Sequence, residues 1–149
     1  MGEATAEQRT NMDLNRRAFE RFNAGDIDGV LELLDPEVEI YVPSDLPNSG
    51  TLHGHGGYLK WVGNWLEAWD GFTVDIMRME AVGERHVVSH ARQSATGKGS
   101  GIPVEMEMAY MTETRDGRAI ALHLYPSADE ARGIAAAREA RALGSRRGP

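Results

Sequence analysis

A chain of 149 residues with 41% hydrophobic and 26% charged residues is long enough for one globular domain that holds both a core and a cavity. Its net charge of −7 disfavours nucleic acid and membrane surfaces as partners, because both attract positively charged proteins. The absence of cysteine excludes disulfides and thiolate chemistry, and without a signal peptide or a long apolar span we expect a cytoplasmic location.

The N-terminal part of the chain predicts two helices and then a strand. Residues 6–24 carry apolar side chains on one helical stripe, and a possible capping box begins at Thr5. Asp26 can cap a second helix that ends before Pro36. A strand is expected at 37–42, so the segment joins two helices to a strand with almost no loop.

The middle of the chain predicts a loop, a third helix and a strand-rich region. Residues 43–57 are rich in turn-forming residues and could border a pocket. Aromatic and apolar residues recur at helical spacing from Tyr58 to Trp69. From Phe72 the period changes to two, which predicts antiparallel strands at 72–82, 86–96, 102–114 and 118–125.

The C-terminal part predicts a closing helix. Ser127 and Glu130 form a capping box that opens an alanine-rich helix to about residue 143. We expect a single domain over 1–149, with an ordered core at about 6–143 and flexible terminal residues. The order of elements indicates an α+β fold in which helices pack on one face of a curved sheet.

Four segments within residues 11–140 resemble the SnoaL-like branch of the nuclear-transport-factor-2-like superfamily: RAFERFNAGDIDGVLELLDPEVEIYV, GTLHGHGGYLKWVGNWLEAW, GKGSG and TRDGRAIALHLY. The resemblance implies a cone-shaped, curved antiparallel sheet with helices packed on its concave face, enclosing a pocket. It also implies a homodimer formed through the sheet. The superfamily includes polyketide cyclases, ketosteroid isomerases, epoxide hydrolases, dehydratases and non-enzymes, so the fold leaves the function open.

The catalytic sets of two better-known branches are absent at the matching positions. Beside ketosteroid isomerases, the oxyanion tyrosine, the basic aspartate and the oxyanion aspartic acid fall on Ala18, Tyr41 and Ala109. Beside limonene epoxide hydrolases, the water-holding residues fall near Glu39 and Tyr41, and the Asp-Arg-Asp relay falls near uncharged residues. Both mechanisms are therefore disfavoured.

Strand alternation leaves two candidate pocket faces for the segment 102–114. One face carries Glu105 and Glu107, and the other is apolar around Met106 and Tyr110. The superfamily alignment puts the acidic face toward the pocket. The expected substrate-binding residues, which share inward positions on the strands or on the third helix, are Tyr58, Trp61, Trp65, Gln93, Glu105, Met111, Leu122 and Leu124.

Glu39, Tyr41 and Glu107 are the predicted catalytic residues. Glu107 could take a proton beside a carbonyl, while Tyr41 or a protonated Glu39 donates to the developing enolate. This chemistry needs no cofactor. In the alternative interpretation, Glu105 and Glu107 lie on a solvated or dimer-facing surface near Arg92.

The expected function is binding of a small, largely apolar molecule, with cofactor-free cyclisation, isomerisation or hydration of a polyketide-, steroid- or terpenoid-like compound. The alternative is a non-catalytic ligand-binding or protein-interaction module on the same fold.

Other candidate residues have weaker patterns. Trp61 and Trp65 could wall the pocket or simply pack in the core. His53 and His55 form an H-x-H pair without a third ligand at a recognisable spacing, so no metal site is expected. His90 shares a strand face with Arg92, and both, like His123 on the last strand, are expected to face outward.

Overall fold

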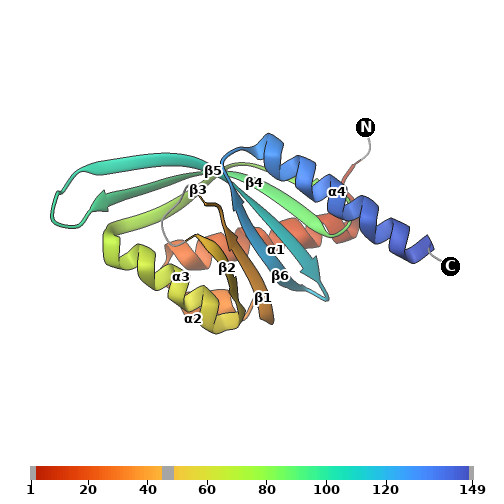
Figure 1. The fold of residues 1–149 in the computed structure, drawn as a ribbon, viewed down its shortest axis with the longest axis horizontal. Coiled ribbons are helices and arrows are strands. Elements are labelled where there is room, and N and C mark those ends of the chain that lie inside the picture. Colours follow the sequence, from red (N-terminus) through yellow and green to blue (C-terminus); the bar gives the residue numbers. More distant parts are fainter. Residues whose placement is uncertain (1–2, 45–48, 148–149) are drawn as a thin grey trace.

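The computed structural model describes residues 3–44 and 49–147 of the chain. Its helices and strands, shown in Figure 1, are in chain order α1 (Ala6–Asn23), α2 (Ile27–Leu31), β1 (Leu34–Val42), β2 (Gly50–His53), α3 (Gly54–Ala68), β3 (Trp69–Val82), β4 (His86–Gly97), β5 (Pro103–Arg115), β6 (Arg118–Tyr125) and α4 (Ala128–Arg147).

The first two helices begin at the caps that the sequence predicts. Both bonds of the Thr5 capping box form, at 2.9 and 3.1 Å, and satisfy backbone groups at the start of α1. Gly25 follows α1 with a φ of 79°, a left-handed conformation that favours glycine. The Asp26 side chain then accepts a hydrogen bond of 2.9 Å from the Gly29 amide and starts α2.

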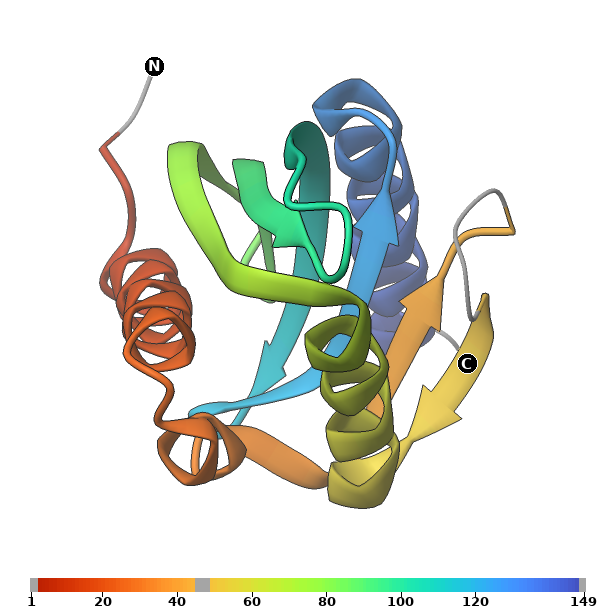
Figure 2. The ribbon, with the colours of Figure 1, turned by 90° about the vertical axis from the view of Figure 1, so that its left-hand side faces the viewer.

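One six-stranded sheet has the order β2-β1-β6-β5-β4-β3. Its neighbouring strands are antiparallel except β1 and β6, which pair in parallel. The sheet is curved and does not close into a barrel (Figures 1 and 2). We name its two sides by their side chains: the inner face carries Tyr110 and Leu122, and the outer face carries Met111 and His123.

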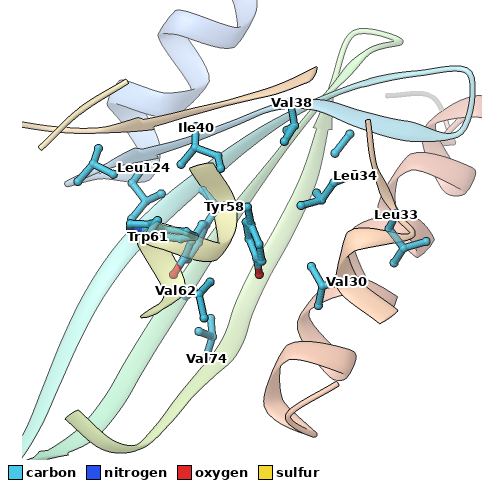
Figure 3. Packing of buried hydrophobic residues seen from close by; sticks show 14 of the residues in the cluster. Val30, Leu33, Leu34, Val38, Ile40, Tyr58, Trp61, Val62, Val74 and Leu124 are labelled. Atoms are coloured by element: carbon cyan, nitrogen blue, oxygen red, sulfur yellow. The ribbon is translucent and has the colours of Figure 1, made fainter. Parts of the chain in front are cut away.

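Helices cover both faces. Figure 2 shows the sheet between α1 on one side and α4 on the other, with α3 on the same side as α1. The inner face, α1 and α3 enclose the larger core, which includes Leu14, Ile40 and Tyr58. Figure 3 shows Tyr58, Trp61 and Val62 pointing from α3 into this core.

The predicted α+β fold with a curved sheet is confirmed, with two differences in detail. The short strand β2 lies where a loop was expected, because residues 50–53 pair with the edge of β1. The helix α4 packs on the outer face and not with the other helices: Ala131 and Ala135 have small side chains that let it lie directly on Met111 and Val88.

Among the described residues, no helix has both the length and the continuous apolar run that crossing a bilayer requires.

Candidate functional site

A cavity of about 60 Å³ lies between the inner face of the sheet and α1, α2 and α3. Its wall is mostly aliphatic and aromatic. The described residues that line it are Leu14, Asn15, Ala18, Phe19, Phe22, Val30, Leu34, Tyr58, Trp61, Val74, Tyr110, Thr112, Ala119 and Leu122. None of these carries a formal charge at neutral pH, so the cavity suits an uncharged molecule.

The region between the inner face and its helices also holds polar atoms that have no hydrogen-bond partner among the described residues. Trp61 Nε1 and Thr112 Oγ1 belong to side chains of the cavity wall. Ser89 Oγ and Gln93 Oε1 lie on strand β4 beside it. Most buried polar atoms in proteins are paired, so unpaired atoms on the side chains of a cavity wall are candidates for contact with a ligand.

Two tyrosines place hydroxyl groups in this region. The Gln93 amide donates a hydrogen bond to the Tyr110 hydroxyl oxygen, which leaves the Tyr110 proton free to be donated elsewhere. Burial raises the pKa of Tyr110, and burial together with the nearby Tyr110 raises the pKa of Tyr58. Both phenols therefore keep their protons at neutral pH and act as neutral hydrogen-bond donors.

Several residues predicted to bind substrate lie on the inner face or on α3, which covers it. Tyr58, Trp61 and Leu122 line the cavity, and Leu124 is fully buried in the core beside it. Gln93 contacts Tyr110 as described above. It also lines a smaller cavity of about 20 Å³ together with Trp65. These residues therefore gather around one region of the molecule.

The orientation expected for strand β5 is wrong. Met106, Met108, Tyr110 and Thr112 face the helices, so alternation turns their sequence neighbours outward. Glu105 and Glu107 are exposed on the outer face, as the alternative interpretation has it. Packing against the helices decides this, because the apolar face of β5 joins the core and the opposite orientation would bury the two carboxylates.

The outward residues of β5 have other contacts. Glu107 lies 3.1 Å from His90 Nε2, and the two side chains are 53% and 33% exposed. Met111 is buried under α4 and not in the cavity. The catalytic role of Glu107 stays a prediction, and it would have to operate outside the inner cavity.

Glu39 and Tyr41 also point to the outer face, since they flank the inward Ile40 on β1. There they lie beside His123 and Tyr125, in a separate groove. The structure therefore brings Glu39 and Tyr41 together, but it does not bring either to Glu107.

The orientation of β5 also bears on the expected homodimer. The apolar face of β5 would need cover from a second subunit if it pointed outward. It faces the inner cavity instead, so this face gives no reason to expect a second subunit. The homodimer itself stays a prediction.

The H-x-H pair has a structural contact. His55 Nε2 lies 2.9 Å from the carbonyl oxygen of Leu34, a hydrogen bond that ties the start of α3 to β1. His53 is the residue that precedes the first turn of α3.

Asn15 and Thr112 are cavity residues that the sequence reasoning missed. A signal for Asn15 existed, because Asn11 and Asn15 stand at i and i+4 beside the apolar stripe of α1. Asn11 Nδ2 donates to the Glu84 carbonyl at 2.8 Å, and Asn15 Nδ2 donates to the Asn11 carbonyl at 2.9 Å. Thr112 follows from alternation once Tyr110 is known to face inward.

The curved, unclosed sheet with helices over its inner face has the nuclear-transport-factor-2-like α+β fold. The model of the SnoaL-like domain matches residues 15–123, and the chain belongs to this family. The chain has no match among curated proteins.

Solved structures with the same fold cover most of the chain. A candidate SnoaL-like polyketide cyclase from Jannaschia sp. CCS1 is 16% identical with a TM-score of 0.75, over 92% of this chain and 99% of that chain. A candidate polyketide cyclase from Xanthomonas campestris pv. campestris is 16% identical with a TM-score of 0.72, over 87% and 99%. TerC, co-crystallised with polyporic acid, is 19% identical with a TM-score of 0.71, over 85% and 98%. At these identities the likeness shows the fold.

Proposed function

We propose that this protein binds a small, neutral, largely apolar molecule with a carbonyl or hydroxyl group in the inner cavity. The observation that carries the proposal is that two side chains of the cavity wall have buried polar atoms, Trp61 Nε1 and Thr112 Oγ1, that lack partners among the described residues. A ligand oxygen would accept from the indole N–H and exchange a hydrogen bond with the threonine hydroxyl.

The electrostatics of the cavity favour a neutral ligand. An anionic ligand would lose its hydration without meeting a lysine, arginine or histidine among the described lining residues, and a cationic one would meet no carboxylate. A carbonyl or hydroxyl group loses little when it is buried next to matching donors. The apolar remainder of the ligand would pack against the aromatic side chains of α1 and α3.

The size of the cavity limits what fits without movement. A single water needs about 10–15 Å³ by this kind of measure, so about 60 Å³ admits a compact group of a few heavy atoms. A larger polyketide-, steroid- or terpenoid-like molecule would require α1 or α3 to shift. Candidate polyketide cyclases and a protein crystallised with polyporic acid share the fold, which supports ligands of this kind.

Catalysis is a second form of the proposal, favoured by the free proton of Tyr110. A neutral phenol that donates to a ligand carbonyl would stabilise an oxyanion developing there, as cyclisation or isomerisation requires. The described lining residues include no carboxylate or imidazole base, so the proton acceptor would have to be water or the ligand itself. Without turnover, the protein would be a ligand-binding module.

Thr112→Val tests the binding site with two opposed readouts. Valine keeps the shape of threonine but removes the hydroxyl, so the free protein should be as stable as the wild type or more stable. Affinity for cyclohexanone or phenol should fall by about 0.5–1.5 kcal/mol, the usual value of one hydrogen bond. Calorimetry measures the affinity, and thermal unfolding measures the stability.

Glu107→Gln is the matched control, because Glu107 lies on the opposite face of the same strand. It should change neither ligand affinity nor stability appreciably. Equal affinity of Thr112→Val and wild type for every bound ligand would refute the assigned site. Product formation from a bound ketone, followed by NMR and lost in Tyr110→Phe, would establish the catalytic form.

A further inference from the structure

The outer face carries a second concavity, which is larger than the inner cavity. It has a volume of about 390 Å³ and lies between β1, β6 and α4. We name it the outer groove and define it by Glu39, Tyr41, His123, Tyr125, Glu130 and Arg138. Its wall is polar and charged, in contrast to the inner cavity.

A chain of three hydrogen-bonded groups lines the outer groove. His123 Nε2 lies 2.7 Å from Glu39 Oε2, and His123 Nδ1 lies 3.1 Å from the Tyr125 hydroxyl. The imidazole is almost completely buried, with 5% of its side chain exposed, whereas the Glu39 side chain is 40% exposed. The buried imidazole therefore connects a solvent-facing carboxylate to a phenol.

Burial sets the direction of these hydrogen bonds. Desolvation lowers the pKa of His123 and outweighs the opposing effect of the Glu39 contact, so the imidazole is neutral at pH 7. Desolvation likewise raises the pKa of Tyr125, which keeps its proton. His123 Nε2–H consequently donates to Glu39, and the Tyr125 hydroxyl donates to His123 Nδ1.

The outer groove offers several acceptors to a ligand. The Glu39 carboxylate has a second oxygen, the Tyr125 oxygen has lone pairs, and the exposed Glu130 adds another carboxylate. The positive group of the groove, Arg138, already donates to Glu113 at 3.1 Å. A ligand that complements these groups must bring hydrogen-bond donors and positive charge.

Aromatic rings favour the same kind of ligand. The Tyr41 ring lies 5.5 Å from the His123 ring and 5.8 Å from the Tyr125 ring, measured between centroids. Tyrosine faces attract cations, and the attraction grows when the site is partly desolvated. The half-buried Ile134 on α4 adds an apolar contact for the rest of the ligand.

We propose that the outer groove binds a small organic cation, an ammonium group on an apolar body, with the ammonium on the free carboxylate oxygen of Glu39 and against the ring of Tyr41. This site is independent of the inner cavity. The two sites would bind ligands of different charge. The wall of the outer groove offers carboxylates, whereas the wall of the inner cavity offers only neutral groups.

The test uses 2-phenylethylammonium as the probe and 2-phenylethanol as its neutral analogue, each measured by calorimetry on the full chain. The ammonium should bind to the wild type. Glu39→Gln should lower the affinity for it about tenfold, equivalent to about 1.4 kcal/mol. Glu105→Gln is the matched control, since it removes the same charge from an exposed position of the outer face near the β4–β5 turn. It should leave the affinity unchanged.

A second variant keeps the test valid if Glu39→Gln misfolds. Glu130 is exposed on α4, so Glu130→Lys should fold normally. The new positive charge at the groove should also lower the affinity for the ammonium about tenfold. Lowering the pH through the pKa of His123 should weaken binding as well, because the imidazolium and the ligand would then repel each other. The charged groups that face this imidazole are Glu39, Glu113 and Arg138.

Three results would overturn the proposal. The first is no binding of the ammonium at millimolar concentration. The second is equal affinity for wild type, Glu39→Gln and Glu130→Lys. The third is a dimer by sedimentation that dissociates in Glu130→Lys, since this would mean that a second copy of the chain occupies the groove.

Discussion

His86→Leu should destabilise the protein far more than the same change at His90, four residues along strand β4. Both histidines face outward and both contact a glutamate. Their environments differ: the His86 side chain is 1% exposed, whereas the His90 side chain is 33% exposed. The pair of substitutions therefore separates a buried polar network from a surface ion pair.

The expected cost follows from the contacts of His86. Its Nδ1 is hydrogen-bonded to Glu139 of α4, and its Nε2 lies 3.4 Å from Glu113 on β5. The hydrogen bond to the Glu139 carboxylate contributes about 1.5–3 kcal/mol, and Glu113 would keep Arg138 as a partner. Leucine fills much of the space, so we expect a loss of about 2–4 kcal/mol for His86→Leu. For His90→Leu the expected loss is about 0–1 kcal/mol.

Urea unfolding followed by tryptophan fluorescence measures both values, because the chain has three tryptophans. The acid side of the stability curve gives a second readout. The contact with His86 lowers the pKa of Glu113 from its ordinary value of 4.5, so Glu113 stabilises the fold above that pH and loses this contribution as the pH falls through its lower folded pKa. His86→Leu should flatten this decline. Equal losses of stability for the two variants would refute the reasoning.

Three further predictions concern single sites. Asp26→Ala should cost about 1 kcal/mol in urea unfolding, because it removes the hydrogen bond that starts α2. Gly83→Ala should lower the free energy of unfolding by about 1–2 kcal/mol because of the φ of 64° at this position, and by more because the new Cβ would meet the Glu139 carboxylate. Unchanged stability of this variant would exclude the turn geometry. Stability should also fall as the pH drops below 6.5, because the unfolded chain protonates His123 more readily than the fold does, and His123→Gln should remove this slope in unfolding curves measured at several pH values.

The local patterns of the sequence were sufficient for most of the fold. The Thr5 capping box and the Asp26 cap place the first two helices, because these bonds join residues three apart in the chain. Alternation placed β3 to β6 to within a few residues, since strands with one buried face repeat every two residues. The apolar residues of α1 that line the cavity belong to the stripe that the sequence shows.

The tertiary structure decided which face of the sheet meets which helix. Alternation divides β5 into a Glu107 face and a Tyr110 face, but both patterns have the same period, so sequence spacing cannot choose between them. Pairing with β4 and β6, together with the packing of α1 and α3, turns Tyr110 inward and Glu107 outward. The same long-range pairing brings Glu39 and His123, 84 residues apart, to 2.7 Å. A charged groove and a neutral cavity on opposite faces thus follow from contacts between distant segments, which no local pattern encodes.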